Sequence, residues 1–173
     1  MIDKKIVKAA RHAIESYFSK ENFVLKEYNE KRGIFVTLYE NGELRGCIGF
    51  IDPVELNKGI IDAARSAAFG DPRFPPVSKN ELTKLKIEVS ILSVPELVKD
   101  IKEIKIGRDG LIIEEGWSKG LLLPQVFPEW NVKTTEDALG MTCEKAGLSR
   151  DRWKDRKNVK IYKFQTEIFK END

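Results

Sequence analysis

The chain has 173 residues, a length within the range of one domain that divides into two lobes. Acidic and basic residues nearly balance, at 28 against 30, which leaves a formal net charge of +2. Because a strong polyanion binder carries a basic excess, this balance argues against nonspecific nucleic-acid binding. It leaves a specific RNA contact open as a minor alternative, with the basic cluster at 150–160 as its place.

The rarer residues exclude further classes. Cys47 and Cys143 are the two cysteines and lie far apart, so neither a disulfide framework nor a zinc site is expected. The spacing of Asp, Glu and His predicts no metal site, and no cofactor is expected. The first 14 residues form no apolar signal region, and no run reaches membrane-spanning length. We therefore expect reduced thiols and a cytoplasmic protein. Abundant Lys and Glu are typical of heat-adapted chains.

Helical spacing of apolar residues predicts a first helix at about residues 3–19. Its one histidine, His12, lies off the apolar stripe and is interpreted as a surface residue.

A hairpin follows, in which Asn41-Gly42 predicts a two-residue turn between strands 34–39 and 43–50. Counting outward from that turn pairs Leu38 with Arg45 and Val36 with Cys47. Cross-strand partners share a face, so this register places the Cys47 thiol among aliphatic side chains.

Gly46 and Gly49 interrupt the second strand of this hairpin. Glycine inside a strand is costly unless another backbone or a ligand approaches closely. We therefore interpret both glycines as positions that keep a binding surface open.

The segment Asp52-Pro53-Val54-Glu55 predicts the start of a second helix, with Asp52 as N-cap, and Gly70 predicts its end. The proline-rich loop 71–77 is expected to be stiff. Two readings of it have equal weight. Asp71, Arg73 and Phe74 line the mouth of a cleft, or Asp71 and Arg73 simply pair on a surface connector.

Strict alternation predicts a strand at 85–92 with Lys86, Glu88 and Ser90 on one face. Glu88 is the carboxylate expected beside Arg45. Such a pair is a structural salt bridge or, under a cleft, a polar floor for a site.

The second half is predicted to contain strands at 111–115 and 121–123, a helix at 135–146 and a last strand at 159–169. Trp117, Phe127 and Trp130 are favoured as packing residues, with an exposed binding surface as the alternative. Cys143 is interpreted as a small core residue.

Five segments in order resemble the AMMECR-type family, named after the AMME chromosomal region candidate protein. The first is Leu44-Arg45-Gly46-Cys47-Ile48-Gly49, and the resemblance spans nearly the whole chain. The others are 71–77, 88–92, Leu123-Pro124-Gln125-Val126 and 145–148.

This resemblance implies an α+β fold of antiparallel sheets with flanking helices, in two unequal lobes with a groove between them. The larger lobe would hold about 1–93 and 157–173, and the smaller lobe about 94–156, within a single domain. It implies no established reaction. It associates the chain with Memo-type proteins and radical S-adenosylmethionine enzymes, in a shared pathway or a modification system. A monomer is the expected state.

Two hypotheses follow for function. The favoured one is a binding or pathway module whose binding residues are Arg45, Gly46, Gly49, Asp71, Arg73, Phe74, Ser90 and Gln125. The alternative is an enzyme or small-molecule site. There Cys47 is the nucleophile or redox thiol, Arg45 lowers its pKa, Arg73 binds an anion and Glu88 handles protons. The aliphatic neighbours expected for Cys47 and the absence of a nearby histidine weigh against this alternative.

Overall fold

The computed structural model describes residues 2–171, which form two compact units. The first unit comprises Met1–Leu92 and Glu167–Asp173, and the second comprises Ser93–Thr166. Residues 157–166 therefore belong to the second unit and not to the larger lobe in which they are expected from the sequence. The α+β class with antiparallel sheets is confirmed. The groove implied between two lobes stays a prediction.

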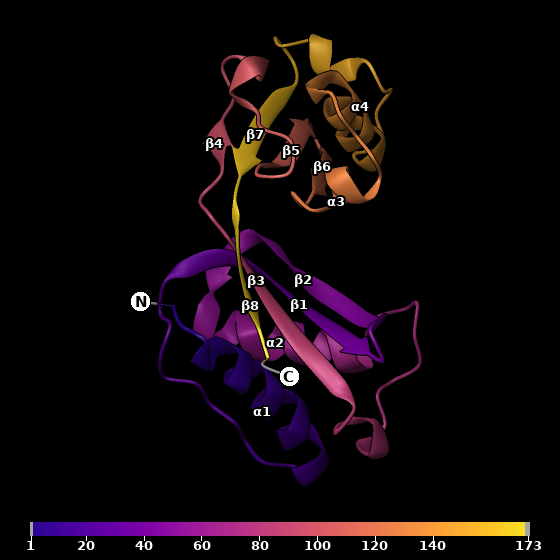
Figure 1. Ribbon diagram of the computed structural model, residues 1–173. Helices are drawn as coiled ribbons and strands as arrows, with labels where there is room; N and C mark the ends of the chain where they lie inside the picture. The colour runs from indigo at the N-terminus through magenta and orange to yellow at the C-terminus, as the bar shows by residue number, and fades with distance from the viewer. Residues whose placement is uncertain (1, 172–173) are drawn as a thin grey trace. The chain divides into compact units, whose positions relative to one another are not determined.

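The first unit is a four-stranded sheet with two helices on one face (Figure 1). Its strand order is β2-β1-β3-β8. The strands are β1 (Lys31–Glu40), β2 (Glu43–Glu55), β3 (Leu85–Leu92) and β8 (Thr166–Lys170). The helices are α1 (Lys5–Ser19) and α2 (Leu56–Phe69). One sheet face is thus covered by helices of its own unit.

The core of this unit lies between that face and the helices. Apolar residues of α1 and α2 recur at helical spacing, and small residues let α2 approach the sheet closely. A Cβ added to Gly46 would meet the carbonyl oxygen of Ala67 at 2.2 Å. The apolar face of the 85–92 strand is buried in this core, and Glu88 and Ser90 on its other face are buried as well. The buried residues that form this layer include Ile6, Ala10, Ala13, Ile14, Ile34, Val36, Leu38, Ile60, Ala63, Ala64, Ile87, Val89 and Ile91.

The predicted turn is present, but the register counted from it is wrong beyond Leu44. Asn41 and Gly42 have φ of 52° and 82°, as a two-residue hairpin turn requires. Tyr39 pairs with Leu44 and Leu38 with Gly46, so Arg45 is an extra residue, a β-bulge. A one-residue shift exchanges the two faces of a strand. Cys47 therefore pairs with Thr37 and not with Val36.

The predicted start of the second helix is also wrong. Asp52 and Pro53 continue β2, and α2 begins three residues later than predicted, at Leu56. β2 is an edge strand, where a proline costs no ladder hydrogen bond. The main-chain N–H groups of Leu56 and Asn57 donate to the carbonyls of Glu30 and Tyr28, which replace a side-chain cap. The predicted end of the helix at Gly70 is confirmed.

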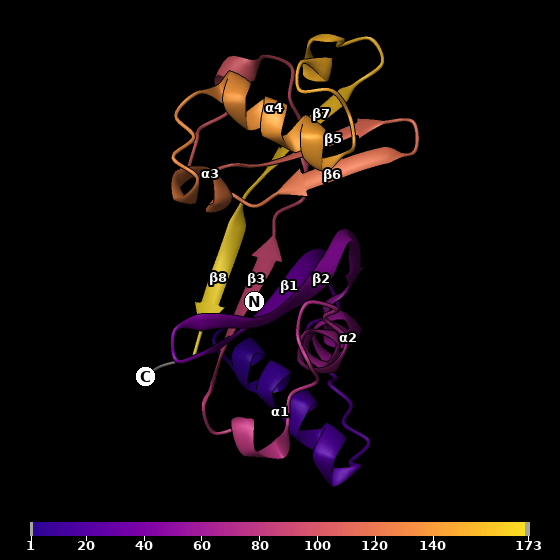
Figure 2. The same ribbon diagram turned by 90° about the vertical axis from the view of Figure 1, so that its right-hand side faces the viewer.

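The second unit has a sheet of order β4-β7-β5-β6. It contains β4 (Glu96–Leu97), β5 (Gly110–Glu115), β6 (Ser118–Leu122) and β7 (Lys160–Phe164). Helix α4 (Thr135–Lys145) lies beside β5 and β6, and the short helix α3 (Val126–Glu129) precedes it (Figure 2). The predicted helix at 135–146 and the burial of Cys143 are confirmed. The strand expected at 159–169 is divided at Gln165 into β7 and β8, which belong to different sheets.

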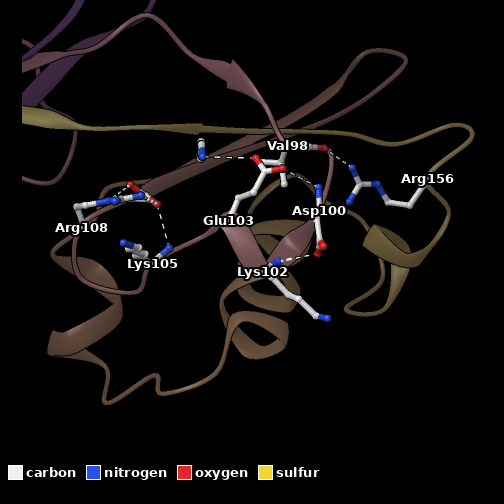
Figure 3. A network of polar contacts seen from close by, with 9 residues as sticks. Val98, Asp100, Lys102, Glu103, Lys105, Arg108 and Arg156 are labelled. Atoms are coloured by element: carbon white, nitrogen blue, oxygen red, sulfur yellow. Dashed lines mark hydrogen bonds and ion pairs between the residues drawn. The ribbon is translucent and has the colours of Figure 1, made fainter.

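Three short 3₁₀ helices complete the chain: η1 (Lys79–Glu81), η2 (Ile101–Glu103) and η3 (Arg152–Lys154). Figure 3 shows the polar contacts around η2. Asp100 and Glu103 form a reciprocal capping box, and Arg156 donates to the carbonyl of Val98. The buried Asp109 accepts from Arg108 and from the main-chain N–H of Lys105. These contacts fix the loop that leads into β5.

The aromatic residues of the second unit divide into two kinds. Phe127 is fully buried, as favoured. Trp117 is fully exposed at the β5–β6 turn, and Trp130 is 72% exposed, so the packing role favoured for them is wrong. Among residues 2–171, no helix has the length and apolar character needed to cross a membrane.

Candidate binding site on the first sheet

A row of polar side chains crosses the sheet face that α1 and α2 leave uncovered. The register places Cys47 of β2 opposite Thr37 of β1, and Thr37 opposite Glu88 of β3. Thr37 Oγ1 and Cys47 Sγ are 3.2 Å apart, within hydrogen-bond distance. Ser90, two residues from Glu88 and therefore on the same face, is also buried. The bulge at Arg45 thus places the thiol among polar groups.

Glu88 pairs with Lys170 of β8, at 2.9 Å between Oε2 and Nζ. This contact extends the polar row to the fourth strand and raises the pKa of Lys170, chiefly through the hydrogen bond to Glu88. The expected pair between Glu88 and Arg45 does not form. Arg45 Nε instead donates to Glu81 at 2.8 Å.

Asp71 is the most constrained residue of the site. It is 4% exposed. Its Oδ2 accepts from the main-chain N–H of Cys47 at 2.9 Å and from Arg73 Nη2 at 2.8 Å. Its Oδ1 accepts from the main-chain N–H and Nε of Arg73, both at 3.0 Å. The Arg73 hydrogen bond is the largest cause that holds the pKa of Asp71 well below its usual range, with the main-chain donors adding to it against the effect of burial. Asp71 is therefore a carboxylate at neutral pH, and it joins the loop to β2 through the Cys47 N–H.

The Arg73 guanidinium is bound to Asp71 on one side and exposed on the other. Its side chain is 55% exposed although it pairs with Asp71. The guanidinium carbon lies 5.4 Å from the centroid of the Phe74 ring, a cation–π contact. The pairing of Asp71 with Arg73 is therefore observed, and it places a half-exposed cation beside β2, while the cleft mouth stays a prediction.

Arg45 and Glu81 fasten the far end of the same loop. Glu81 closes a capping box with Ser78, and its Oε2 accepts from the Ser78 main-chain N–H at 2.7 Å. The hydrogen bond from Arg45 is the main cause that lowers the pKa of Glu81 to about 2. Arg45 Nη1 is buried without a hydrogen-bond partner in the described residues. Arg45 therefore acts on the loop and not on the thiol.

The Cys47 thiol is poorly placed for nucleophilic chemistry. Burial is the largest influence on its pKa and raises it, outweighing the Thr37 hydrogen bond and the Arg73 charge. His12 lies on α1, stacked on Phe23 and 3.2 Å from Glu21, as expected of a surface histidine. Within residues 2–171 no group of His, Cys, Asp and Glu is arranged to hold a metal ion. The thiol is thus protonated at neutral pH and has no histidine beside it.

Both glycines of β2 have packing reasons. Gly46 has no side chain where the backbone of α2 approaches β2 at Ala67. A Cβ on Gly49 would meet the carbonyl oxygen of Ile34 at 2.2 Å and the ring of Phe35 at 2.5 Å. Gln125 belongs to the second unit, where it precedes α3 with its Oε1 buried and without a partner in the described residues.

Thr37, Glu81 and Lys170 complete the site but were not singled out from the sequence. Thr37 had been assigned to the opposite face by the register that the bulge displaces. Glu81 belongs to a capping box with Ser78, a local pattern that carries no sign of the contact to Arg45. Lys170 follows the expected last strand and carries no local signal of its pairing with Glu88.

Comparison with known proteins assigns the chain to a family. The AMMECR1 family model matches residues 7–169. A protein of Methanocella arvoryzae is 49% identical over 179 residues, which cover 96% of this chain and 89% of that protein. Protein MJ0810 of Methanocaldococcus jannaschii is 48% identical, with 95% and 88% covered. The crystal structure of the uncharacterized protein PH0010 from Pyrococcus horikoshii is similar with a TM-score of 0.86 and 45% identity, covering 98% of this chain and 91% of that one. The chain therefore belongs to the AMMECR1 family.

Proposed function

We propose that this protein is a binding module without chemistry of its own, and that its site on the first sheet receives an anionic group of a partner protein. The observation that carries the proposal is the Asp71 carboxylate, which fixes Arg73 to the main chain of Cys47 while more than half of the Arg73 side chain stays exposed. A fixed guanidinium loses less conformational entropy on binding than a free one.

The Arg73 guanidinium keeps binding capacity in this arrangement. Its Nε and Nη2 donate to Asp71, and Nη1 has no bond to residues 2–171. Carboxylate and phosphate oxygens are its preferred acceptors. Lys170, 69% exposed beside Glu88, adds a second cation on the sheet. The segment 71–81, which comprises the 71–77 loop and η1, is bonded to β2 through Asp71 at one end and Glu81 at the other, which favours recognition over a moving catalytic lid.

An enzyme that uses Cys47 is the weaker candidate. A reactive thiol needs a lowered pKa or a neighbouring base. Here burial raises the pKa, and Arg45 is committed to Glu81. Glu88 is committed to Lys170. Because Arg45 and Glu88 are paired with other residues, these contacts support Cys47 as a residue that lines the site and does not react.

The family resemblance supplies candidates for the partner. A Memo-type protein and a radical S-adenosylmethionine enzyme are the proteins with which we expect this module to act in one pathway. The specific RNA contact left open at the 150–160 cluster is not favoured, because two arginines of that cluster are paired with carboxylates. There Arg150 pairs with Asp137 and Glu144, and Arg152 pairs with Glu115 and Asp155.

The proposal is tested with the full chain immobilised and the purified Memo-type protein and radical S-adenosylmethionine enzyme of the same organism as probes. Wild type should capture at least one of them, and Arg73→Ala should reduce capture about tenfold, the loss expected for one charge-assisted contact. Lys99→Ala is the matched control, since Lys99 is an exposed cation of the second unit. Capture of neither probe, or equal capture by Arg73→Ala, would overturn the proposal.

A further inference from the structure

The Asp71–Cys47 hydrogen bond fixes which way the backbone of β2 faces. In an antiparallel pair, facing residues alternate between hydrogen-bonded and non-hydrogen-bonded pairs. The Cys47 N–H donates to Asp71, outside the sheet, so Cys47 and Thr37 form a non-hydrogen-bonded pair. Gly49 and Phe35, two residues along, form another. The main-chain groups of Cys47 and Gly49 therefore face away from β1.

β2 is the edge strand of this sheet, so these groups have no neighbouring strand. Asp71 satisfies the Cys47 N–H. The Cys47 carbonyl and both main-chain groups of Gly49 have no partner outside the sheet in residues 2–171. Irregularities bound the stretch on both sides, at Arg45 and opposite Gly33, and leave five regularly paired residues between them. Natural sheets blunt their edges with bulges and prolines, and here Arg45 and Pro53 lie outside the regular stretch.

A groove with a volume of about 330 Å³ begins one residue beyond Gly49. Phe50, Pro53 and Val54 of β2 and Gly59 of α2 form its apolar part, and the charged residues Lys31, Glu55, Lys58 and Asp62 also line it. Phe50 and Val54 pack against the core of the first unit and remain half-buried. An inward side chain of an added strand would continue this apolar layer above α2.

We propose that β2 takes up an extended segment of a partner polypeptide, which adds to the sheet at Cys47 and Gly49 and inserts an apolar side chain into the Phe50–Asp62 groove. This inference rests on the proposed function, because it specifies how the partner docks at the same site. A main chain in β conformation is the ligand that supplies an acceptor for the Gly49 N–H and donors for the two carbonyls at strand spacing. The Asp71 carboxylate already accepts from the Cys47 N–H, where the next carbonyl of the added strand would otherwise lie. Asp71 therefore determines where the added strand ends.

The first test uses a phage-displayed library of peptides of about six residues, the usual strand length, selected on the immobilised full chain. Hydrogen exchange of the ¹⁵N-labelled protein is then followed with a selected peptide bound. The Gly49 amide should become protected, whereas the Cys47 amide, already bonded to Asp71, should change little. Failure to select any peptide, or bound peptides that leave the Gly49 amide exchanging as before, would overturn strand addition.

The second test uses the alternation of a strand. Two versions of the selected peptide are N-methylated at alternate residues, one at the odd and one at the even positions (the two parities). One version should bind about tenfold more weakly, and the other should bind as the unmodified peptide does. Asp62→Trp, which fills the groove from an exposed helical position, should also weaken binding, and Asp62→Ala is its control. Equal effects of both parities would contradict the proposal. If Arg73→Ala loses capture of the Memo-type protein while Gly49 stays unprotected, strand addition is wrong and the binding module stands.

Discussion

Replacing Asp71 by alanine removes the group that joins the 71–77 loop to β2. Four hydrogen bonds disappear, one from the Cys47 main chain and three from Arg73. The Arg73 guanidinium is largely exposed and regains water, so its loss counts for about 1 kcal/mol or less. Two main-chain N–H groups lose a charged acceptor at about 1 kcal/mol each. We therefore expect Asp71→Ala to lower the free energy of unfolding by about 2 to 3 kcal/mol.

Urea unfolding at neutral pH measures this loss. Trp117, Trp130 and Trp153 all lie in the second unit, so tryptophan fluorescence follows that unit and circular dichroism follows both. Because Asp71 lies in the first unit, the loss of stability should lower the urea midpoint seen by circular dichroism more than the midpoint seen by tryptophan fluorescence. Arg73→Ala is the matched comparison and should cost about 1 kcal/mol or less. Equal stability of Asp71→Ala and wild type, within about 0.5 kcal/mol, would refute the role given to the carboxylate.

The stability difference between wild type and Asp71→Ala should depend on pH. The pKa of Asp71 in the folded protein is lowered, mainly by Arg73. A group with a lowered folded pKa stabilises fully above its unfolded pKa, about 3.9 for aspartate, and its contribution is lost as pH falls through the folded value. The difference between wild type and Asp71→Ala should therefore be largest at neutral pH and shrink below about pH 4.

Three further predictions concern single positions. Cys47 should react slowly with a thiol reagent at neutral pH, with a rate midpoint above the free-thiol value of about 8.5; a lower midpoint would restore the nucleophile hypothesis. Gly46→Ala should destabilise by about 2 kcal/mol or more in urea unfolding, since the new methyl meets the Ala67 carbonyl at 2.2 Å, and an unchanged midpoint would show that α2 can move away. Trp117→Ala should change thermal stability by less than about 0.5 kcal/mol, while Phe127→Ala should cost about 3 to 5 kcal/mol; comparable losses would mean that Trp117 packs against the protein.

Periodic and capping patterns predicted most elements of this fold because their signals are local. The alternation at 85–92 predicted the strand β3, and helical spacing predicted the helix that the structure has as α4. The start of α2 was mispredicted for a physical reason. Asp52-Pro53 satisfies the rules of a helix start, but proline is equally compatible with an edge strand, and the chain's place in the sheet decides between them.

The site was harder to predict from the sequence, because one extra residue in β2, Arg45, changes which side chains share a face. Counting from Asn41-Gly42 assumes an uninterrupted ladder, and a bulge leaves no periodic signal in the sequence. The extra residue Arg45 moves Cys47 from the aliphatic face to the face of Thr37 and Glu88. Cys47, Asp71 and Arg73, all named from the sequence, contact one another, whereas Gln125 lies in the second unit. Arg45 pairs with Glu81, and Glu88 with Lys170.

The central claim is that β2 and the loop beside it form a recognition surface for a partner protein. Titration of the ¹⁵N-labelled full chain with the purified Memo-type protein of the same organism tests it most directly. We predict saturable chemical-shift changes at the amides of Gly49 and Arg73, with protection of the Gly49 amide from exchange. Unchanged amides along β2 and the 71–77 loop at saturating partner, or changes confined to the second unit, would contradict the account.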